Sequence, residues 1–316
     1  MIQQNSKSTL IGTIFGLGSA LSFGISTPLA KVLIGQIQPV MLAGLMYLGG
    51  GLGLAAIQAV RQLNKRPVAP FSRKDWGWLM ASILSGGILA PLLLMFSLTY
   101  TSASTASLLL NFDGVFTALL AWSIFQERLQ IPVLFGIIAI TAGATVLCSQ
   151  EGYSEFGLSW GAFLILGTCF FWALDSNLTN KVSGKDAIQV AMLKSMVAGF
   201  INIAIALTVG QTLPPVLSFL AVCVVGFFTY GINLLCFVLA LRYMGASRTG
   251  AFLALSPFIG VAFSVLFLEE EITRHFEIAA LLMAIGVGFC LIKGEKNQSK
   301  ANSDFLSNCG GEDKNS

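Results

Sequence analysis

Long apolar runs separated by short polar stretches dominate the chain. Each run approaches the roughly 20 residues that a helix needs to cross a bilayer core of about 30 Å. Ten runs are predicted as helices, at 10–30, 39–60, 76–98, 103–125, 131–149, 158–179, 187–209, 215–240, 247–268 and 275–293. Most connections between them are too short for a domain outside the membrane. The pattern predicts an all-α polytopic membrane protein with ten transmembrane helices.

Composition supports the same class of protein. Of the 316 residues, 55% are hydrophobic and 10% are charged, whereas soluble domains carry about 25% charged residues. The segment 294–316 is polar and rich in Gly, Ser and Asn, and it is predicted to be a disordered cytoplasmic tail. The first run is too long for a signal-peptide core, so it is predicted to be a retained helix.

Lysine and arginine are placed very unevenly along this ten-helix topology. With a cytoplasmic N-terminus, almost all of them lie on the cytoplasmic side, while Lys31 and Arg274 lie outside and Lys194 lies within a span. Short cytoplasmic loops of membrane proteins are enriched in Lys and Arg. The sequence therefore predicts an integral protein of the inner or plasma membrane with both termini in the cytoplasm.

The chain also resembles itself at two similar offsets. "ISTPLAKV" from Ile25 lies over "DSNLTNKV" from Asp175 at a shift of 150 positions, and "YTSASTAS" from Tyr100 lies over "YMGASRTG" from Tyr243 at a shift of 143. The second shift also pairs Glu127 with Glu270 and Gly143 with Gly286. The predicted halves, 10–149 and 158–293, contain five spans each, so the second enters the membrane from the opposite side. Such inverted repeats are typical of secondary transporters.

The fourth predicted span reads "LNFDGVFTALLAWSIFQERL" and is followed by "IPVLFGIIAITAGATVL"; the second half carries a related stretch, "LALSPFIGVAFSVLFLEEEIT". On these motifs the chain resembles the EamA-type members of the drug/metabolite transporter superfamily, from about residue 10 to residue 292. In that family an acid and a proline precede a Phe-Thr-Ala stretch, and a Glu ends the helix. Here Asp113 and Glu127 fill the acidic positions. Gly114 replaces the first proline, and Pro257 is kept in the second half.

The resemblance implies transport by alternating access, with a central cavity lined by spans 1, 3, 4, 6, 8 and 9. Glycine at position 114 still permits a bend in span 4, because it has no side chain. The candidate substrate-binding residues are polar or aromatic side chains within these spans: Ser22, Ser26, Asn111, Asp113, Trp172, Asp175, Tyr230, Asn233 and Ser256.

Asp113 is the first choice for proton coupling or contact with a cation, because an ionised side chain within a membrane is costly and usually functional. Its alternative role is a hydrogen bond between helices. Asn111 lies two residues away and cannot share its helical face. Both Glu127 and Glu270 are interpreted as structural residues at the membrane edge.

Trp172, Asp175 and Ser176 share one helical face, which suits a cationic or zwitterionic solute. Alternatively, Asp175 simply approaches the cytoplasmic interface. For Lys194 we favour a side chain that snorkels to the surface, with an ion pair to Asp175 as the alternative. Tyr230 and the nearby Asn233 either contact the solute or hold helices together.

No nucleophile and base pair, phosphate-binding loop, metal-ligand spacing or basic nucleic-acid patch is found in the sequence. We therefore predict no enzyme activity, no cofactor, no metal and no nucleic-acid partner. The favoured function is secondary transport of a small metabolite, an amino acid or amine, with export favoured and proton coupling left open. The alternatives are a carrier of an anionic solute, such as a nucleotide sugar or sugar phosphate, and a membrane scaffold or sensor. The oligomeric state is not predicted.

Overall fold

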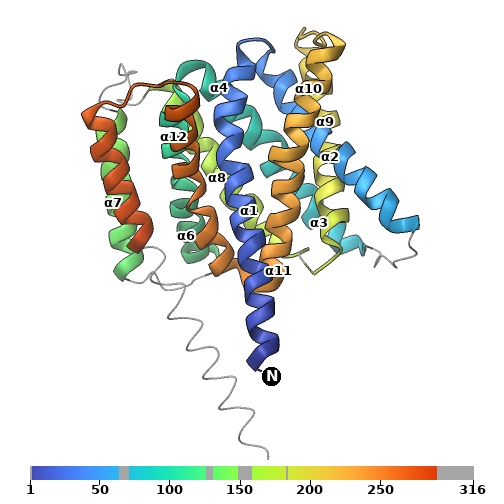
Figure 1. The fold of residues 1–316 in the computed structure, drawn as a ribbon, viewed down its shortest axis with the longest axis horizontal. Coiled ribbons are helices and arrows are strands. Elements are labelled where there is room, and N and C mark those ends of the chain that lie inside the picture. Colours follow the sequence, from blue (N-terminus) through green and yellow to red (C-terminus); the bar gives the residue numbers. More distant parts are fainter. Residues whose placement is uncertain (1, 64–70, 126–130, 149–158, 183, 290–316) are drawn as a thin grey trace, which may run out of the picture.

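A computed structural model describes residues 2–63, 71–125, 131–148, 159–182 and 184–289, and within these residues every regular element is helical (Figure 1). The elements are α1 (Ile2–Ile34), α2 (Pro39–Leu63), α3 (Arg73–Ser82), η1 (Ile83–Leu89), α4 (Ala90–Tyr100), α5 (Ala103–Leu109), α6 (Phe112–Phe125), α7 (Ile131–Cys148), α8 (Trp160–Asn180), α9 (Ala187–Thr208), α10 (Val216–Gly226), η2 (Phe227–Gly231), α11 (Ile232–Leu253), α12 (Ser256–Phe267) and a last helix over 274–289. The predicted tail, 294–316, and Glu127 lie outside the described residues.

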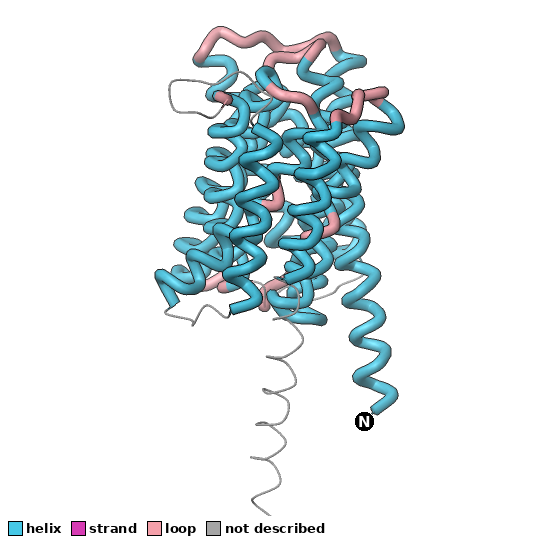
Figure 2. Tube along the Cα trace, turned by 90° about the vertical axis from the view of Figure 1, so that its left-hand side faces the viewer, coloured by secondary structure: helices cyan, strands magenta, loops and turns pink. Residues whose placement is uncertain are grey.

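Seven of the described helical stretches are long and apolar enough to cross a membrane. They are Leu10–Ile34, Pro39–Arg61, Arg73–Tyr100, Ala103–Leu120, Trp160–Asn180, Ala187–Thr208 and Val216–Tyr243, and shorter apolar helices cover Ile131–Leu147 and Ser256–Phe267. The helices stand side by side, with their connections gathered at the two ends of the bundle (Figure 2). The predicted class, an all-α polytopic membrane protein, is confirmed.

Two long helical stretches contain a π-helical segment. η1 lies between α3 and α4, and η2 lies between α10 and α11. A π turn bonds each amide one residue further back than an α turn, which frees backbone carbonyls for other partners.

The predicted connection at 241–246 is wrong, because α11 continues through it to Leu253. This stretch contains no proline that would end the helix.

The fourth predicted span breaks at Leu110 and Asn111, between α5 and α6. A break therefore forms without the usual proline, although it precedes Gly114 rather than falling on it. A second break, at residues 254–255, separates α11 from α12. Pro257 sits in the first turn of α12, where a missing backbone N–H removes no helical hydrogen bond.

Glycines allow the helices to approach closely. A Cβ on Gly199 of α9 would lie 2.6 Å from the backbone nitrogen of Leu48 in α2, and a Cβ on Gly49 would lie 2.1 Å from the carbonyl oxygen of Cys223 in α10. α1 packs on α11 and α12, and α8 packs on α4, η1 and α6. α7 packs along the last helix at one edge of the bundle (Figure 1). The structure thus supports close helix packing as the role of these glycines.

Candidate functional site

The π segment η1 connects three other helices through its carbonyl groups. The oxygen of Gly86 accepts hydrogen bonds from Tyr47 Oη of α2 (2.8 Å) and Trp172 Nε1 of α8 (3.3 Å). The oxygen of Gly87 accepts one from Asn202 Nδ2 of α9 (2.9 Å). Buried carbonyls need such partners, because an unpaired polar group in an apolar interior is costly. Polar side chains from three helices therefore hold the irregular backbone of η1 in place.

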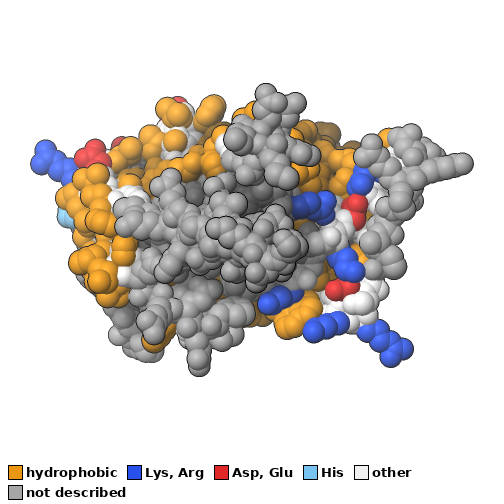
Figure 3. Space-filling model, turned by 90° about the horizontal axis from the view of Figure 1, so that it is seen from below, with side chains coloured by type: hydrophobic (Ala, Val, Ile, Leu, Met, Phe, Trp, Pro, Cys, Tyr) orange, Lys and Arg blue, Asp and Glu red, His pale blue; other side chains and the backbone are white. Residues whose placement is uncertain are grey.

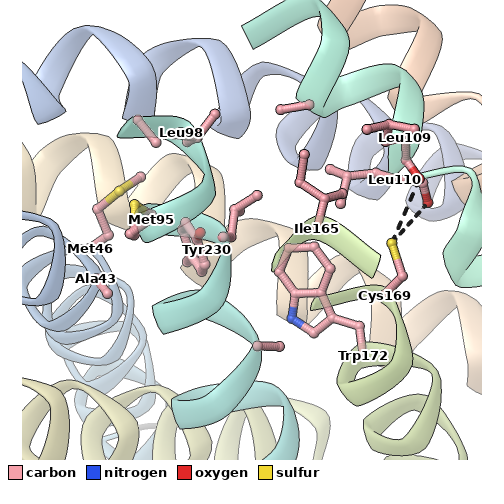
Figure 4. Packing of buried hydrophobic residues seen from close by; sticks show 14 of the residues in the cluster. Ala43, Met46, Met95, Leu98, Leu109, Leu110, Ile165, Cys169, Trp172 and Tyr230 are labelled. Atoms are coloured by element: carbon pink, nitrogen blue, oxygen red, sulfur yellow. Dashed lines mark hydrogen bonds between the residues drawn. The ribbon is translucent and has the colours of Figure 1, made fainter. Parts of the chain in front are cut away.

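Four aromatic side chains gather around Gly86 and form what we call the aromatic cluster: Phe23, Tyr47, Trp172 and Tyr230. The rings of Phe23 and Trp172 meet edge to face at 4.9 Å, and those of Tyr47 and Tyr230 are tilted at 4.6 Å. Trp172 and Tyr230 both lie near the teal helix formed by η1 and α4 (Figure 4). The Tyr230 hydroxyl is buried and has no hydrogen-bond partner within the described residues.

A buried ion pair lies beside the aromatic cluster. Lys194 Nζ of α9 is 2.5 Å from Asp175 Oδ1 and 2.6 Å from Oδ2 of α8, and the Lys194 residue is only 2% exposed. Thr179 Oγ1 accepts a third hydrogen bond from Lys194 (3.0 Å), and Ser82 Oγ donates to Asp175 Oδ1 (2.6 Å). Every ammonium hydrogen of Lys194 thus has an acceptor.

Gly86 joins the two groups into one central site. A Cβ at position 86 would lie only 2.1 Å from Asp175 Oδ2, while the Gly86 carbonyl contacts the aromatic cluster. The prediction that Lys194 snorkels to the surface is wrong, because its ammonium is held by the carboxylate of Asp175. The alternative pairing is correct, and Asp175 is buried in a charge-neutral group rather than placed at the interface.

The predicted serines and Asn233 lie elsewhere. Asn233 Oδ1 of α11 accepts a hydrogen bond from Ser19 Oγ of α1 (2.7 Å), so it holds two helices together. Ser26 and Ser256 donate to the carbonyls of Phe23 and Leu253. These two serines therefore satisfy nearby backbone groups. Ser22 is half-buried on α1, one turn before Ser26, and Ser176 is half-buried on α8.

Asn111 and Asp113 lie at and just after the break between α5 and α6. Asn111 Nδ2 donates to the carbonyl of Leu108 (2.8 Å). Its Oδ1, and Oδ1 of the half-buried Asp113, have no hydrogen-bond partner within the described residues. The first-choice acid of the sequence, Asp113, thus has no hydrogen bond to the other candidates, but its carboxylate lies close enough to that of Asp175 for the two charges to interact.

Sequence reasoning found Trp172, Asp175 and Tyr230 but missed several of their neighbours: Phe23, Tyr47, Ser82, Gly86 and Thr179. Most of these residues are unremarkable in an apolar span. One usable signal was the run of small residues at 85–87, in the middle of a predicted helix, since interior glycines weaken a helix unless packing requires them.

A second polar arrangement holds the turn at Thr101 and Ser102, at the opposite end of the bundle from the N-terminus. Lys31 Nζ donates to the carbonyls of Leu98 (2.6 Å) and Thr101 (2.7 Å) at the end of α4. The carboxylate of Glu270 accepts from the backbone amides of residues 103 and 104, both at 2.9 Å. The structural role predicted for Glu270 is thus a cap on α5. A cavity of about 510 Å³ opens beside this turn, between Lys31 and Trp160.

A helical bundle with long apolar spans and a small buried polar centre is typical of a membrane transporter. The comparison with known families makes the class specific. The EamA-like transporter family matches residues 10–149 and 159–292. The chain therefore belongs to the EamA-like transporter family, within the drug/metabolite transporter superfamily.

Two relatives cover nearly the whole chain. An uncharacterized transporter of Methanothermobacter thermautotrophicus is 31% identical over 292 residues, which are 88% of this chain and 85% of the relative. The uncharacterized transporter YvbV of Bacillus subtilis is 25% identical over 289 residues, 89% of this chain and 91% of that protein. One solved crystal structure has the same fold with a TM-score of 0.64 at 17% identity, and the match covers 92% of this chain and 98% of that one.

Proposed function

We propose that the protein is a secondary transporter that moves a small metabolite by alternating access of two five-helix halves, 10–149 and 158–293. The observation that carries this proposal is the composition of the central site. Its residues come from α1, α2 and η1 of the first half and from α8, α9 and η2 of the second. A site shared between two halves changes its access when the halves move against each other.

The proposed topology of ten spans in two inverted repeats is supported by matching irregularities. η1 begins at Ile83 and η2 begins at Phe227, 144 positions later (227 − 83). The two helix breaks, at 110–111 and 254–255, are also 144 positions apart (254 − 110). Irregular backbone inside a membrane must find partners in the surrounding protein. Its occurrence at corresponding places therefore favours duplication.

The crossing of α7 and the last helix also favours duplication. A Cβ on Gly143 would meet Met283 and the carbonyl of Ala279, and a Cβ on Gly286 would meet Ile140 and the carbonyl of Gly136. The two sets of contacts are equivalent at a shift of 143 positions, which relates Gly143 to Gly286, Ile140 to Met283 and Gly136 to Ala279. This relation is expected where two copies of one helix cross about a two-fold axis.

We propose an amino acid or amine as the solute and export as the direction. The central site contains four aromatic rings, whose faces suit a solute with an ammonium group. The ion pair also disfavours the alternative of an anionic solute, because Asp175 already neutralises Lys194. Proton coupling stays a proposal, with Asp113 and Asp175 as the residues to test.

We propose that both termini lie in the cytoplasm. Lys and Arg side chains gather on the end of the molecule that carries the N-terminus (Figure 3). Two ion pairs there, Arg61 with Asp186 and Lys185 with Asp75, are both 3.0 Å long. An excess of basic residues on one side is the usual mark of the cytoplasmic face.

The test is release from proteoliposomes, measured by mass spectrometry with and without a pH gradient. One set is loaded with a mixture of amino acids and amines, and a second set with nucleotide sugars and sugar phosphates. Selective loss of one solute supports transport, and a rate that rises with the gradient supports proton coupling. Trp172→Ala removes part of the aromatic cluster and is expected to slow release at least tenfold. Ile138→Ala, on the exposed face of α7, is the control. If no amino acid, amine, nucleotide sugar or sugar phosphate is released, the transport proposal fails and the scaffold remains.

A further inference from the structure

We infer that Asp175 and Lys194 determine the charge of the solute: the ion pair selects a zwitterion, whose ammonium takes the place of Lys194 and whose carboxylate takes the place of Asp175. This inference rests on the proposed transport function and narrows it. Neither the class of solute nor the pair follows from the family match, since the relatives are known only as uncharacterized transporters.

The first step is the complete pairing of the two charges. All three hydrogens of the Lys194 ammonium are engaged, by both oxygens of Asp175 and by Thr179. The carboxylate is also bound by Ser82 and Thr179. A solute therefore reaches either charge only by displacing the other.

The second step concerns what each kind of solute leaves behind. An amine that bound Asp175 would leave the ammonium of Lys194 in a site that is only 2% exposed. A simple carboxylate that bound Lys194 would leave Asp175 without its cation. An uncompensated buried charge is strongly unfavourable. Only a solute with both charges replaces one balanced set of contacts with another.

The third step is that the fold itself does not need the pair. At the shift of 150 that relates 25–32 to 175–182, Asp175 corresponds to Ile25. The next helices, α2 and α9, begin 148 positions apart (187 − 39), so Lys194 corresponds to Met46. The first half builds the corresponding helices with no charge at either position. Replacing a buried ion pair with apolar residues is often neutral or stabilising in other proteins. A role in recognition accounts for its presence in one half alone.

The fourth step is the setting of the pair. Trp172 lies one helical turn before Asp175, and Tyr230 offers a buried hydroxyl with no partner within the described residues. The aromatic cluster gives an apolar wall for the uncharged part of a solute. The paired side chains are in direct contact, so this conformation is closed at the pair. Binding of the zwitterion requires α8 and α9 to separate there.

The experiment uses probes that differ only in charge. Purified wild-type protein is titrated by calorimetry with leucine, isopentylamine and 4-methylpentanoate, and then with phenylalanine, phenethylamine and 3-phenylpropionate. The zwitterion of at least one series is expected to bind tenfold or more tightly than its amine and its acid. Equal binding within both series, or no binding of any probe, would overturn the inference.

Single variants should invert the preference. Lys194→Met leaves Asp175 alone and is expected to favour the amine, while Asp175→Asn leaves Lys194 alone and is expected to favour the carboxylate. Lys185→Met removes a partly exposed ion pair with Asp75 and should keep the zwitterion preference. Unchanged preference in both single variants contradicts the inference.

If the single variants do not fold, Asp175→Asn combined with Lys194→Met removes both charges together and is expected to lose the zwitterion preference. A double variant that retains the preference contradicts the inference. Failure of the inference is distinguishable from failure of the transport proposal. Release of singly charged or uncharged solutes from proteoliposomes, without preference for zwitterions, overturns only the role of the pair.

Discussion

Gly86 is the residue on which the geometry of the central site depends most directly. Its carbonyl holds Tyr47 and Trp172, and its missing side chain makes room for Asp175. Both properties come from a backbone that passes through a π turn, so one position fixes the aromatic cluster and the carboxylate together. A glycine in such a place is required by close approach rather than by its freedom to bend.

Gly86→Ala is therefore expected to destabilise the protein by about 1–3 kcal/mol, the usual range for overpacking, and to impair transport. The new methyl group would lie 2.1 Å from Asp175 Oδ2. Thermal unfolding in detergent and release from proteoliposomes measure the two effects. Gly114→Ala is the matched control, because no atom beyond its chain neighbours and own helix backbone lies within 4 Å of a Cβ there. Equal effects of the two variants would refute the assignment.

The two tyrosines of the aromatic cluster should respond differently to loss of their hydroxyl groups. Tyr47→Phe removes the hydrogen bond to the Gly86 carbonyl and is expected to cost about 1 kcal/mol of stability. Tyr230→Phe removes a hydroxyl with no partner within the described residues, so stability should hold or rise while transport falls. A stability loss in Tyr230→Phe equal to that in Tyr47→Phe would show that the Tyr230 hydroxyl is structural.

How much of the site a sequence reveals depends on the kind of residue. Trp172, Asp175 and Tyr230 stand out because polar or amphipathic side chains are unusual inside apolar spans. The favoured role of Lys194 was wrong because its distance from the helix end suggested escape to the surface, whereas the deciding fact was an acid on the neighbouring helix. Tyr47 and Gly86 gain their roles from packing between helices, which no single span encodes.

At the scale of elements, the turn between α4 and α5 is held by two oppositely charged side chains from distant parts of the chain. Lys31 binds carbonyls at the end of α4, and Glu270 binds amides at the start of α5. Each charge faces the helix end of opposite polarity, which is the favourable arrangement for a helix dipole. The turn is thereby fixed to α1 and to the loop before the last helix.

Glu270→Ala frees two amides and is expected to lower stability by about 1–2 kcal/mol, as loss of a helix cap does. Thermal unfolding is the measurement. The exposed neighbour Glu271 supplies the control, since Glu271→Ala should change stability by less than about 0.5 kcal/mol. A Glu270→Ala variant as stable as the wild type would mean that the cap contributes nothing.

The positions of the long helices were predictable, because hydrophobic length alone determines what can cross a bilayer. Their internal irregularities were not. In η1, side chains such as those of Asn202 and Trp172 bind the freed carbonyls, and those partners lie far away in sequence. The continuation of α11 through 241–246 was missed for a related reason, since a drop in hydropathy does not end helical hydrogen bonding.

On the scale of the whole molecule, the two proposed halves share a backbone plan but not a charge distribution. Both halves have a π segment and a broken helix at matching places, yet only the second carries the buried ion pair. In the proposed mechanism the shared plan would let the halves exchange conformations, while the charges at the central site come from the second half.

The duplication itself is testable where α7 crosses the last helix. Gly143 and Gly286 occupy equivalent surroundings, with a Cβ 2.8 Å from Met283 in one case and 2.7 Å from Ile140 in the other. Gly143→Val and Gly286→Val are thus expected to lower stability by similar amounts, about 1–3 kcal/mol each. Gly288→Val, with no such atom within 4 Å of its Cβ, is the control for the valine itself. The stability losses of Gly143→Val and Gly286→Val should differ by no more than Gly288→Val differs from the wild type. A larger difference would mean that the two glycines are not energetically equivalent, and the π segments and helix breaks alone would then support inverted repeats.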